Sequence, residues 1–328
     1  MRDKRLVMLA DWLQYVHGVT PEGLSPASND ASFRRYFRFF HGDTSYIVMD
    51  APPEQEDCKS FVHVSQEFLS LGVHVPQVLA SDLKQGFLLL TDLGKQTYLQ
   101  QLNESNADYL YHDAIATLIK IQQGGLHHLG EFPAYSAQML LSEMQLFADW
   151  LLGQHLQISM NSRQVQQWNH CRQWLVEQAL SQPVTWVHRD YHSRNLMVCD
   201  IPNPGVLDFQ DTVEGPLTYD LVSLLKDCYI RWPRGRVLQW LSDYQQRASD
   251  ADLPVPGYSQ LLEWFDLMGV QRHLKAAGIF ARLCHRDQKP GYLTDIPRVL
   301  AYIIDTAQRY PQLAVLDKLC QRALLMLT

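Results

Sequence analysis

The hydrophobic and polar positions of the first 93 residues predict a strand-rich segment with two helices. Apolar residues recur at helical spacing from Leu6 to Val16, and a second amphipathic stretch ends at Gly72, a typical helix stop. Aromatic residues alternate with arginines just before the polar turn at 41–44, as expected for the first strand of a hairpin. The expected elements are a helix at the N-terminus, a helix at 55–71, and strands at 32–39, 45–49, 76–80 and 86–91.

From Lys95 onward the pattern is mainly helical. Two short apolar runs, 184–187 and 205–207, interrupt it and predict buried strands. We therefore expect an α+β protein, with a small β-rich lobe at 1–93 and a large, mainly helical lobe at 94–328. The expected helices are 105–122, 135–153, 162–181, 217–230, 235–249, 258–284, 293–309 and 313–326.

Composition narrows the class of protein. The chain of 328 residues has a formal net charge of −7, which does not favour nucleic acid as a partner. The six cysteines are scattered without a C-x-x-C pair, as expected in a reducing compartment. The apolar stretch after Leu6 is broken by Asp11, so we expect a helix there and no signal peptide, and no run is long enough to span a membrane. These features predict a cytoplasmic protein with no membrane association, and no obligate protein partner is evident from the sequence.

The candidate chemistry lies in two segments that each follow a predicted strand. Residues 188–195 have the sequence HRDYHSRN, and residues 205–210 have the sequence GVLDFQ. Asp190 precedes Asn195 by five residues, and Asn195 precedes Asp208 by thirteen. Kinase-type phosphoryl transfer needs one Asp to accept the hydroxyl proton, and an Asn and a second Asp to hold metal-bound phosphates. The alternative is an ordinary strand-turn-strand with carboxylates on its loops.

A second copy of the tripeptide serves as an internal control. His285-Arg286-Asp287 lies at the end of a helical pattern, and position 292 is Tyr where the first copy has Asn. The tripeptide alone is therefore a weak signal. Its strand context and its partners make the first copy specific, and they predict a bilobal, protein-kinase-like fold.

The chain resembles the aminoglycoside phosphotransferase and choline kinase-like family. Within it, the chain is most similar to the bacterial kinases that act on the anomeric hydroxyl of N-acetylmuramate and N-acetylglucosamine in cell-wall recycling. The resemblance covers nearly the whole chain, and it implies ATP and Mg²⁺ as cofactors and a bacterial cytoplasm. The segments that carry it are NDASFRRYFR at 29–38, MDAPP at 49–53, HRDYHSRNLM at 188–197, LDFQD at 207–211 and QRHLK at 271–275.

Two departures from the wider kinase pattern affect the expected nucleotide site. The strand Tyr46–Asp50 lacks the phosphate-binding lysine, and the loop 28–32 contains no glycine. Arg34 or Arg35 could supply the missing charge, or both could simply project from the solvent face of a strand; strand alternation lets only one of them face a cleft. The expected nucleotide-binding residues are Ser32, Arg34, Arg35, Thr91, Asp92 and Leu93.

The residues around Asp190 are expected to have catalytic, metal-binding, structural and substrate-binding roles. Asp190 is the predicted general base, and Asn195 and Asp208 are the predicted Mg²⁺ ligands. His188 and Arg189 are expected to brace the loop. Asp220, through its resemblance to a kinase helix aspartate, is expected to hold the loop's backbone. The expected substrate-binding residues are His192, Arg194, Asp211, Arg272 and Lys275.

The substrate residues carry alternatives. His192 and Arg194 could be solvated loop residues, and Asp211 could cap a loop. Arg272 and Lys275 begin a basic stripe that continues along one helical face to Arg286. The stripe could receive an anionic group such as a lactyl carboxylate, or it could be a solvated surface.

We therefore predict a small-molecule sugar kinase that forms the α-1-phosphate of N-acetylmuramate, N-acetylglucosamine or both. Two alternatives remain at this point. One is a phosphotransferase for choline, homoserine or an aminoglycoside, although the basic stripe disfavours polycationic substrates. The other is a nucleotide-binding pseudokinase, suggested by the absent lysine.

Overall fold

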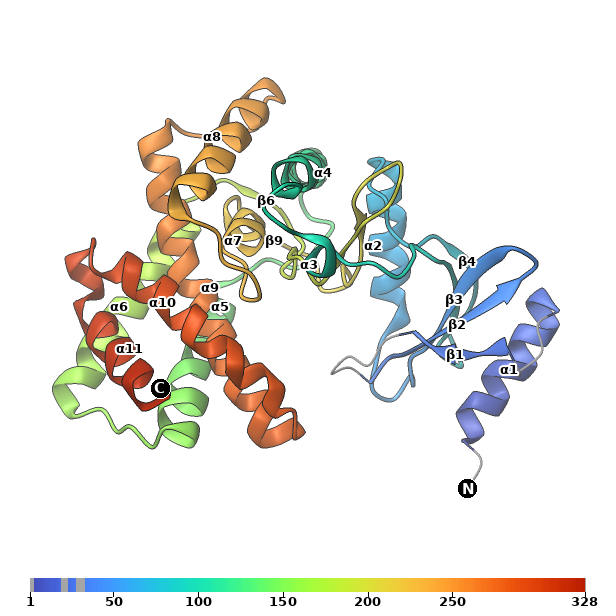
Figure 1. Ribbon diagram of the computed structural model, residues 1–328, viewed down its shortest axis with the longest axis horizontal. Coiled ribbons are helices and arrows are strands. Elements are labelled where there is room, and N and C mark those ends of the chain that lie inside the picture. Colours follow the sequence, from blue (N-terminus) through green and yellow to red (C-terminus); the bar gives the residue numbers. More distant parts are fainter. Residues whose placement is uncertain (1–2, 19–22, 28–32, 328) are drawn as a thin grey trace. The chain divides into compact units, whose positions relative to one another are not determined.

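The computed structural model describes residues 3–18, 23–27 and 33–327, and the chain forms two compact units (Figure 1). The predicted fold class is confirmed, because a β-rich N-terminal part is followed by a mainly helical part. These units differ from the predicted lobes 1–93 and 94–328, because the later segment 197–211 packs with the N-terminal part. The first unit contains Met1–Gln96 and Met197–Asp211, and the second contains Thr97–Leu196 and Thr212–Thr328.

The first unit is built on a five-stranded antiparallel sheet. The hairpin of β2 (Arg35–His41) and β3 (Thr44–Asp50) turns at Gly42, whose φ of +60° suits a residue without Cβ. Both predicted hairpin strands and both later strands are confirmed to within a few residues. In spatial order the strands are β1 (Ser25–Pro26), β2 (Arg35–His41), β3 (Thr44–Asp50), β5 (Phe87–Thr91) and β4 (Val78–Asp82).

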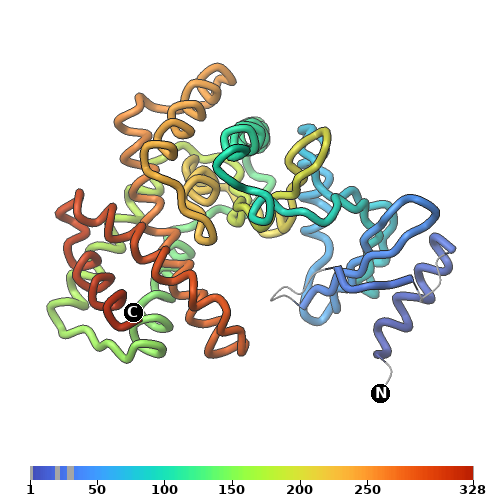
Figure 2. The backbone as a smooth tube through the Cα atoms, in the orientation of Figure 1, coloured from blue at the N-terminus to red at the C-terminus, as the bar shows by residue number. Residues whose placement is uncertain are grey.

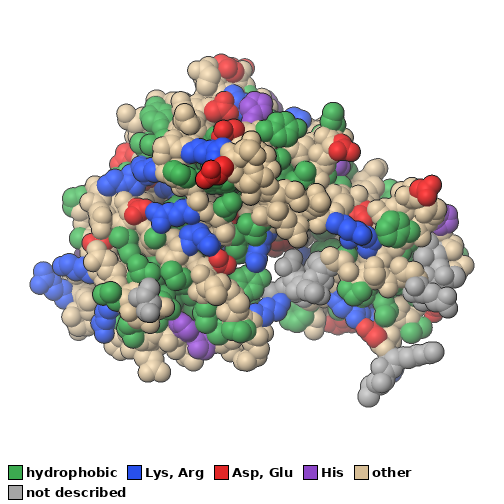
Figure 3. Space-filling model, in the orientation of Figure 1, with side chains coloured by type: hydrophobic (Ala, Val, Ile, Leu, Met, Phe, Trp, Pro, Cys, Tyr) green, Lys and Arg blue, Asp and Glu red, His purple; other side chains and the backbone are tan. Residues whose placement is uncertain are grey.

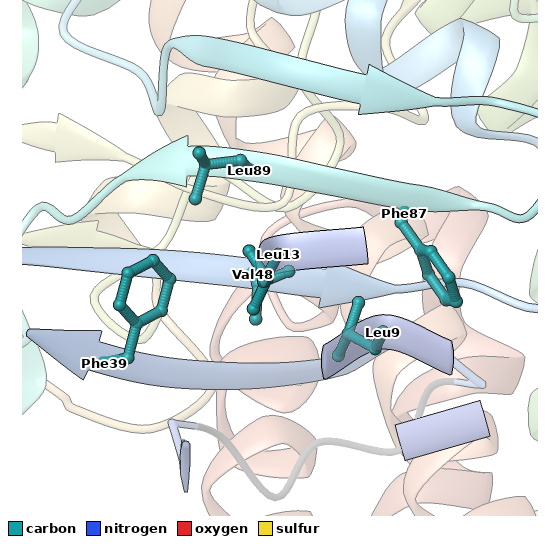
Figure 4. Close-up of a cluster of buried hydrophobic side chains, with 6 residues drawn as sticks. All are labelled: Leu9, Leu13, Phe39, Val48, Phe87 and Leu89. Atoms are coloured by element: carbon teal, nitrogen blue, oxygen red, sulfur yellow. The ribbon is translucent and has the colours of Figure 1, made fainter. Parts of the chain in front are cut away.

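Helix α1 (Lys4–His17) covers one face of this sheet. Asp3 caps its N-terminus by accepting a hydrogen bond from the Leu6 N–H, and Gly18 ends it in the left-handed conformation. Its apolar face packs onto alternate residues of three strands, which explains the helical spacing seen in the sequence. The buried cluster consists of Leu9, Leu13, Phe39, Val48, Phe87 and Leu89 (Figure 4).

Helix α2 (Cys58–Ser70) joins the later segment 197–211 to the first unit. Phe209 packs against Phe61 and Phe68 of this helix, with ring centroids 4.7 Å and 6.0 Å apart. The Val206 N–H of β8 (Gly205–Val206) donates to the His74 carbonyl at 2.7 Å. The segment that carries Asp208 therefore belongs to the same packing unit as the sheet, although it follows more than 100 residues later.

Helix α9 (Tyr258–Asp287) is the central element of the second unit. It packs against helices that precede it and follow it in the sequence, and more than half of its 30 residues are buried. The course of the chain through this unit can be followed in Figure 2. Its other helices are α3 (Tyr98–Gln101), α4 (Ala107–His127), α5 (Ala137–Leu146), the π-helix η2 (Phe147–His155), α6 (Ser162–Leu180), α7 (Tyr219–Leu225), α8 (Arg234–Asp250), α10 (Ile296–Ala307) and α11 (Ala314–Leu327), with 3₁₀ turns η3 (Pro290–Asp295) and η4 (Pro311–Leu313).

Short strands bring the candidate loops into place. β6 (Val184–Val187) pairs with β9 (Val213–Pro216) in an antiparallel ladder, and β7 (Leu196–Met197) with β8 in a second two-stranded sheet. The predicted strands at 184–187 and 205–207 are thus confirmed. Two helix predictions needed correction. The expected helix 135–153 changes to π geometry at Phe147, and the expected helix 217–230 ends at Leu225.

No helix in the described ranges is long and apolar enough to cross a membrane. The face shown in Figure 3 has Lys and Arg side chains interrupted by acidic, apolar and neutral ones.

Candidate active site

The loop 188–195 leaves β6 and is held by a buried carboxylate of α7. Both oxygens of Asp220 accept backbone hydrogen bonds, from the His188 N–H at 2.6 Å and the Arg189 N–H at 3.0 Å. Burial raises the pKa of Asp220 to about 6, although the charge of His188 and the two N–H donors act in the opposite direction. The predicted structural role of Asp220 is confirmed by this geometry.

A second buried carboxylate, Asp227, holds the other end of the loop. Its Oδ2 accepts from the Ser193 N–H at 2.9 Å, and its Oδ1 accepts from the Tyr229 N–H at 2.8 Å. The second bond turns the chain away from the helical path, which explains why α7 ends before the predicted residue. Sequence reasoning missed Asp227. The available signal was its position seven residues after Asp220, two helical turns along the same pattern.

Arg189 braces the loop, as expected, and its partner is Glu143 of α5. The residue adopts a φ of +77°, a conformation that needs support from its surroundings. Its Nη2 donates to Glu143 Oε1 at 2.7 Å. The other oxygen of Glu143 accepts from the Tyr135 hydroxyl and from Gln271 Nε2 at 3.3 Å. Burial alone would raise the pKa of Glu143, but the neighbouring charge of Lys275 and these hydrogen bonds lower it, so the carboxylate stays ionised.

Lys275 and Arg272 of α9 are buried, so the alternative of a solvated surface is wrong for these two residues. The Lys275 ammonium lies 3.0 Å from Glu143 Oε1 and donates to the Tyr219 hydroxyl at 3.0 Å. These contacts engage two of its three N–H donors, and its predicted substrate contact stays a prediction. Arg272 donates to Cys228 Sγ at 3.3 Å, and its Nε is buried without a hydrogen-bond partner.

The Asp190 carboxylate is 43% exposed, and His192 Nε2 lies 4.0 Å from its Oδ1. Desolvation would raise its pKa, but the charges of Lys275, His192 and Arg272 outweigh this and lower the pKa to about 2. Asp190 is therefore ionised at neutral pH. Since the pKa is lower in the folded chain, ionised Asp190 stabilises the fold above pH 3.8, and this contribution disappears as the pH falls toward 2.

We expect Lys275→Met to move the acid limb of the pH profile of kcat/KM to higher pH. Lys275 is the charge that lowers the pKa of Asp190 most, and desolvation raises that pKa. Without Lys275 the effect of desolvation is offset less, so the pKa of Asp190 rises. The measurement is kcat/KM over the acidic range in which the variant stays folded. Lys226→Met is the matched control, because Lys226 is also buried and ion-paired, to Asp266 at 2.8 Å. An equal shift in both variants would contradict the assignment to Asp190.

Two further loop residues predicted to bind substrate lie against aromatic rings. The buried His192 ring meets Tyr229 edge-on at 5.3 Å, and the Arg194 guanidinium lies over the face of the same ring at 4.0 Å. Arg194 is exposed, and it also lies 5.3 Å from the Tyr292 centroid. The second-unit residues expected at the site are thus on or around one loop.

The predicted metal ligands are found in different units, and each presents oxygen. Asn195 Nδ2 donates to the Asp190 carbonyl at 3.0 Å, which directs Oδ1 to the other side of the amide. Asp208, at a φ of +61°, accepts from Gln210 Nε2 at 2.8 Å, and Gln210 also donates to Asp211 Oδ2 at 3.4 Å. Amide and carboxylate oxygens are each donors of the kind that Mg²⁺ prefers, so the role of both residues as metal ligands stays a prediction. Gln210, which positions both carboxylates, was not predicted.

In the first unit, both candidate arginines form ion pairs. Arg34 pairs with Glu56 at 2.7 Å. Arg35 pairs with Asp50, whose fully buried carboxylate also pairs with Arg5 at 2.5 Å. The Arg34 side chain is 10% exposed and the Arg35 side chain is 37% exposed, so the two arginines differ in their access to solvent. The predicted Ser32 lies outside the described residues.

The expected adenine-binding segment follows β5. Thr91 Oγ1 accepts from the Gln77 N–H at 2.9 Å. The Leu93 carbonyl accepts from the Cys199 thiol at 3.5 Å. Asp92 is bound bidentately by Arg38, with Nε–Oδ2 2.5 Å and Nη2–Oδ1 2.9 Å. Burial alone would raise the pKa of Asp92, but Arg38 lowers it. The Asp92 side chain therefore fixes the segment, and Arg38, whose role the sequence did not reveal, links it to β2.

The second tripeptide behaves as the sequence predicts. His285-Arg286-Asp287 forms the last residues of α9, and the Arg286 guanidinium pairs with Asp287 at 2.9 Å on the surface. Its Asp has neither the preceding strand nor the buried carboxylates that surround Asp190.

A model of the phosphotransferase enzyme family matches residues 23–264. The chain belongs to this family. A Pseudomonas aeruginosa protein named N-acetylmuramate/N-acetylglucosamine kinase is 51% identical, with 92% of this chain and 88% of that protein covered. Proteins of the same name from Pseudomonas putida and Neisseria meningitidis are 48% and 41% identical, over 97% and 95% of this chain and 96% and 94% of theirs.

Solved structures show the same fold at low identity. Choline kinase LicA from Streptococcus pneumoniae has a TM-score of 0.62 at 10% identity, covering 92% of this chain and 99% of that one. An aminoglycoside phosphotransferase in complex with gentamicin has a TM-score of 0.60 at 14% identity, covering 89% and 95%. The chain is thus an enzyme of the phosphotransferase class with a kinase-like fold.

Proposed function

We propose that this phosphotransferase transfers a phosphoryl group from ATP to the anomeric hydroxyl of N-acetylmuramate, N-acetylglucosamine or both. The product would be the α-1-phosphate, formed in the cytoplasm during peptidoglycan recycling. The observation that carries the proposal is the name shared by three relatives that are 41–51% identical over more than nine-tenths of this chain. The ionised Asp190 on a doubly held loop supports it.

The chemistry asked of Asp190 is modest. In a loose phosphoryl-transfer transition state the base orients the nucleophile and accepts its proton late, so a carboxylate of low pKa is sufficient. The anomeric hydroxyl is more acidic than other sugar hydroxyls, which reduces the demand further. Asp220 and Asp227 hold the loop backbone on both sides of Asp190, so the carboxylate is positioned before the substrate arrives.

Asn195 and Asp208 are the proposed Mg²⁺ ligands, and bound Mg²⁺ would neutralise charge on the phosphate oxygens. The described part of β3 offers no lysine to the phosphates, and Arg34 and Arg35 are the proposed sources of positive charge. Each guanidinium already pairs with a carboxylate and has five N–H donors, so phosphate could bind to the remaining donors or in exchange for that partner. The backbone of residues 91–93 is proposed to contact adenine, since the Asp92 side chain is engaged by Arg38.

The test is ADP release with Mg·ATP against N-acetylmuramate, N-acetylglucosamine, choline, homoserine and kanamycin. We expect turnover on the amino sugars alone, with a product that no longer reacts with reducing-end reagents. Turnover on another compound would contradict the substrate and leave the phosphotransferase chemistry intact. Bound ATP without turnover on any of the five would favour a pseudokinase.

A further inference from the structure

Arg194 has an unusual setting for an exposed cation on a catalytic loop. Its guanidinium lies between two tyrosine rings, 4.0 Å from the Tyr229 centroid and 5.3 Å from that of Tyr292. Phe280 fixes both rings, with centroids 5.9 Å from Tyr229 and 5.5 Å from Tyr292. The long side chain is therefore ordered by aromatic contacts before any ligand binds.

The charge of Arg194 has no carboxylate partner within ion-pair distance among residues 3–18, 23–27 and 33–327. Its acidic neighbour Asp295 pairs with Arg298 instead. The other cations around the loop are occupied or enclosed. Arg189 pairs with Glu143, as does Lys275, whereas Arg272 is buried.

A row of contacts links Arg194 to the candidate base. The His192 Nε2 lies 4.0 Å from Asp190 Oδ1, and the His192 ring meets the edge of Tyr229, whose face carries Arg194. An acceptor that lies along this row with one hydroxyl at Asp190 would place its far substituents toward the guanidinium. All members of the row belong to the second unit, so the geometry is internal to it.

We propose that Arg194 determines specificity by binding a carboxylate on the acceptor sugar, held in position by Tyr229 and Tyr292. This inference rests on the proposed function. N-acetylmuramate differs from N-acetylglucosamine only by a lactyl ether at the ring carbon two positions from the anomeric centre. A guanidinium pairs with a carboxylate through two parallel hydrogen bonds. Because the tyrosine faces already order the arginine, it loses less conformational entropy when it binds the carboxylate. The enzyme should therefore bind the acidic sugar more tightly than the neutral one.

The experiment compares the two sugars in the same enzyme preparation. In Arg194→Gln we expect kcat/KM for N-acetylmuramate to fall about 10- to 100-fold more than kcat/KM for N-acetylglucosamine, the range of a hydrogen-bonded charge pair. The loss is expected mainly in KM, because the carboxylate does not change during the reaction. Arg194→Lys should recover only part of the preference, since an ammonium lacks the fork of donors.

Arg231→Gln is the matched control. Arg231 is also an exposed arginine over a tyrosine ring, 5.1 Å from the Tyr302 centroid, but it is ion-paired to Asp305 at 2.5 Å. Its loss should leave the ratio between the two sugars unchanged. Raised salt should lower the preference of the wild-type enzyme for N-acetylmuramate over N-acetylglucosamine. The same change in salt should alter this preference less in Arg194→Gln.

Each outcome separates this inference from the proposed function. A wild-type enzyme that phosphorylates neither sugar removes the proposed function and this inference with it. A wild-type enzyme that phosphorylates both, with Arg194→Gln reducing both equally or neither, leaves the function standing and overturns the role of Arg194. A selective loss for N-acetylmuramate that Arg231→Gln does not reproduce supports it.

Discussion

Asp190→Asn is expected to lower turnover by roughly 10²- to 10⁴-fold while ATP binding persists. The substitution removes the proton acceptor and keeps the shape of the side chain. The loop should keep its conformation, because it is held through Asp220, Asp227 and Glu143 and not through the Asp190 carboxylate. The measurements are ADP release at saturating sugar and the Kd for Mg·ATP.

Asp287→Asn is the control for that experiment, since it makes the same change in the second copy of the tripeptide. Asp287 is at the surface end of α9 and pairs with Arg286. Its loss should leave turnover within about twofold of wild type, as is usual for exposed ion pairs. An Asp190→Asn enzyme that retains more than a tenth of wild-type turnover would contradict the role of Asp190 as the base.

Gly278→Ala is expected to destabilise the second unit by about 3 kcal/mol or more. A Cβ at this position of α9 would lie 2.3 Å from the Leu146 carbonyl carbon and 2.5 Å from the Phe147 nitrogen. These atoms belong to the backbone where α5 passes into the π-helix η2, so no side-chain rotation relieves the collision. Thermal unfolding would show the effect as a large fall in Tm, with reduced yield of folded protein.

Gly235→Ala is the matched control, because Gly235 is also helical and a Cβ there meets nothing within 4 Å. Alanine is a better helix former than glycine, so this variant should be as stable as wild type or slightly more so. Equal stability of the two variants would show that α9 can shift away from α5, and it would contradict the close approach at Gly278.

Local pattern was sufficient for most of the secondary structure. The helical spacing of Leu9 and Leu13 reflects burial against the sheet, and the alternation in β2 reflects a strand with two different faces. The places where the prediction failed have non-local causes. The chain leaves the helical path after Leu225 because Asp227 accepts backbone hydrogen bonds from Ser193 and Tyr229. Helical periodicity over 135–153 likewise does not distinguish α from π geometry.

The candidate catalytic loop was also recognisable in the sequence, and the roles of its residues stay a prediction. Asp190 and Asn195 depend on short spacings within one loop, and the preceding apolar strand supplied the context that the second tripeptide lacks. The role of Asp220 could be predicted because it resembles the helix aspartate that, in kinases, holds the backbone of the loop. Family resemblance extended this information to the expected cofactors and substrate.

Charge partners were decided only by the tertiary structure. The sequence placed Arg272 and Lys275 on one stripe, but burial against α5 and α7 gave Lys275 two internal partners. Arg194 is exposed and lies over the Tyr229 ring. Arg38 and Asp92 are 54 residues apart, and Arg189 and Glu143 are 46 apart. Periodicity reports which face of an element is buried, whereas an ion pair depends on which two elements pack together, and that is set by the fold as a whole.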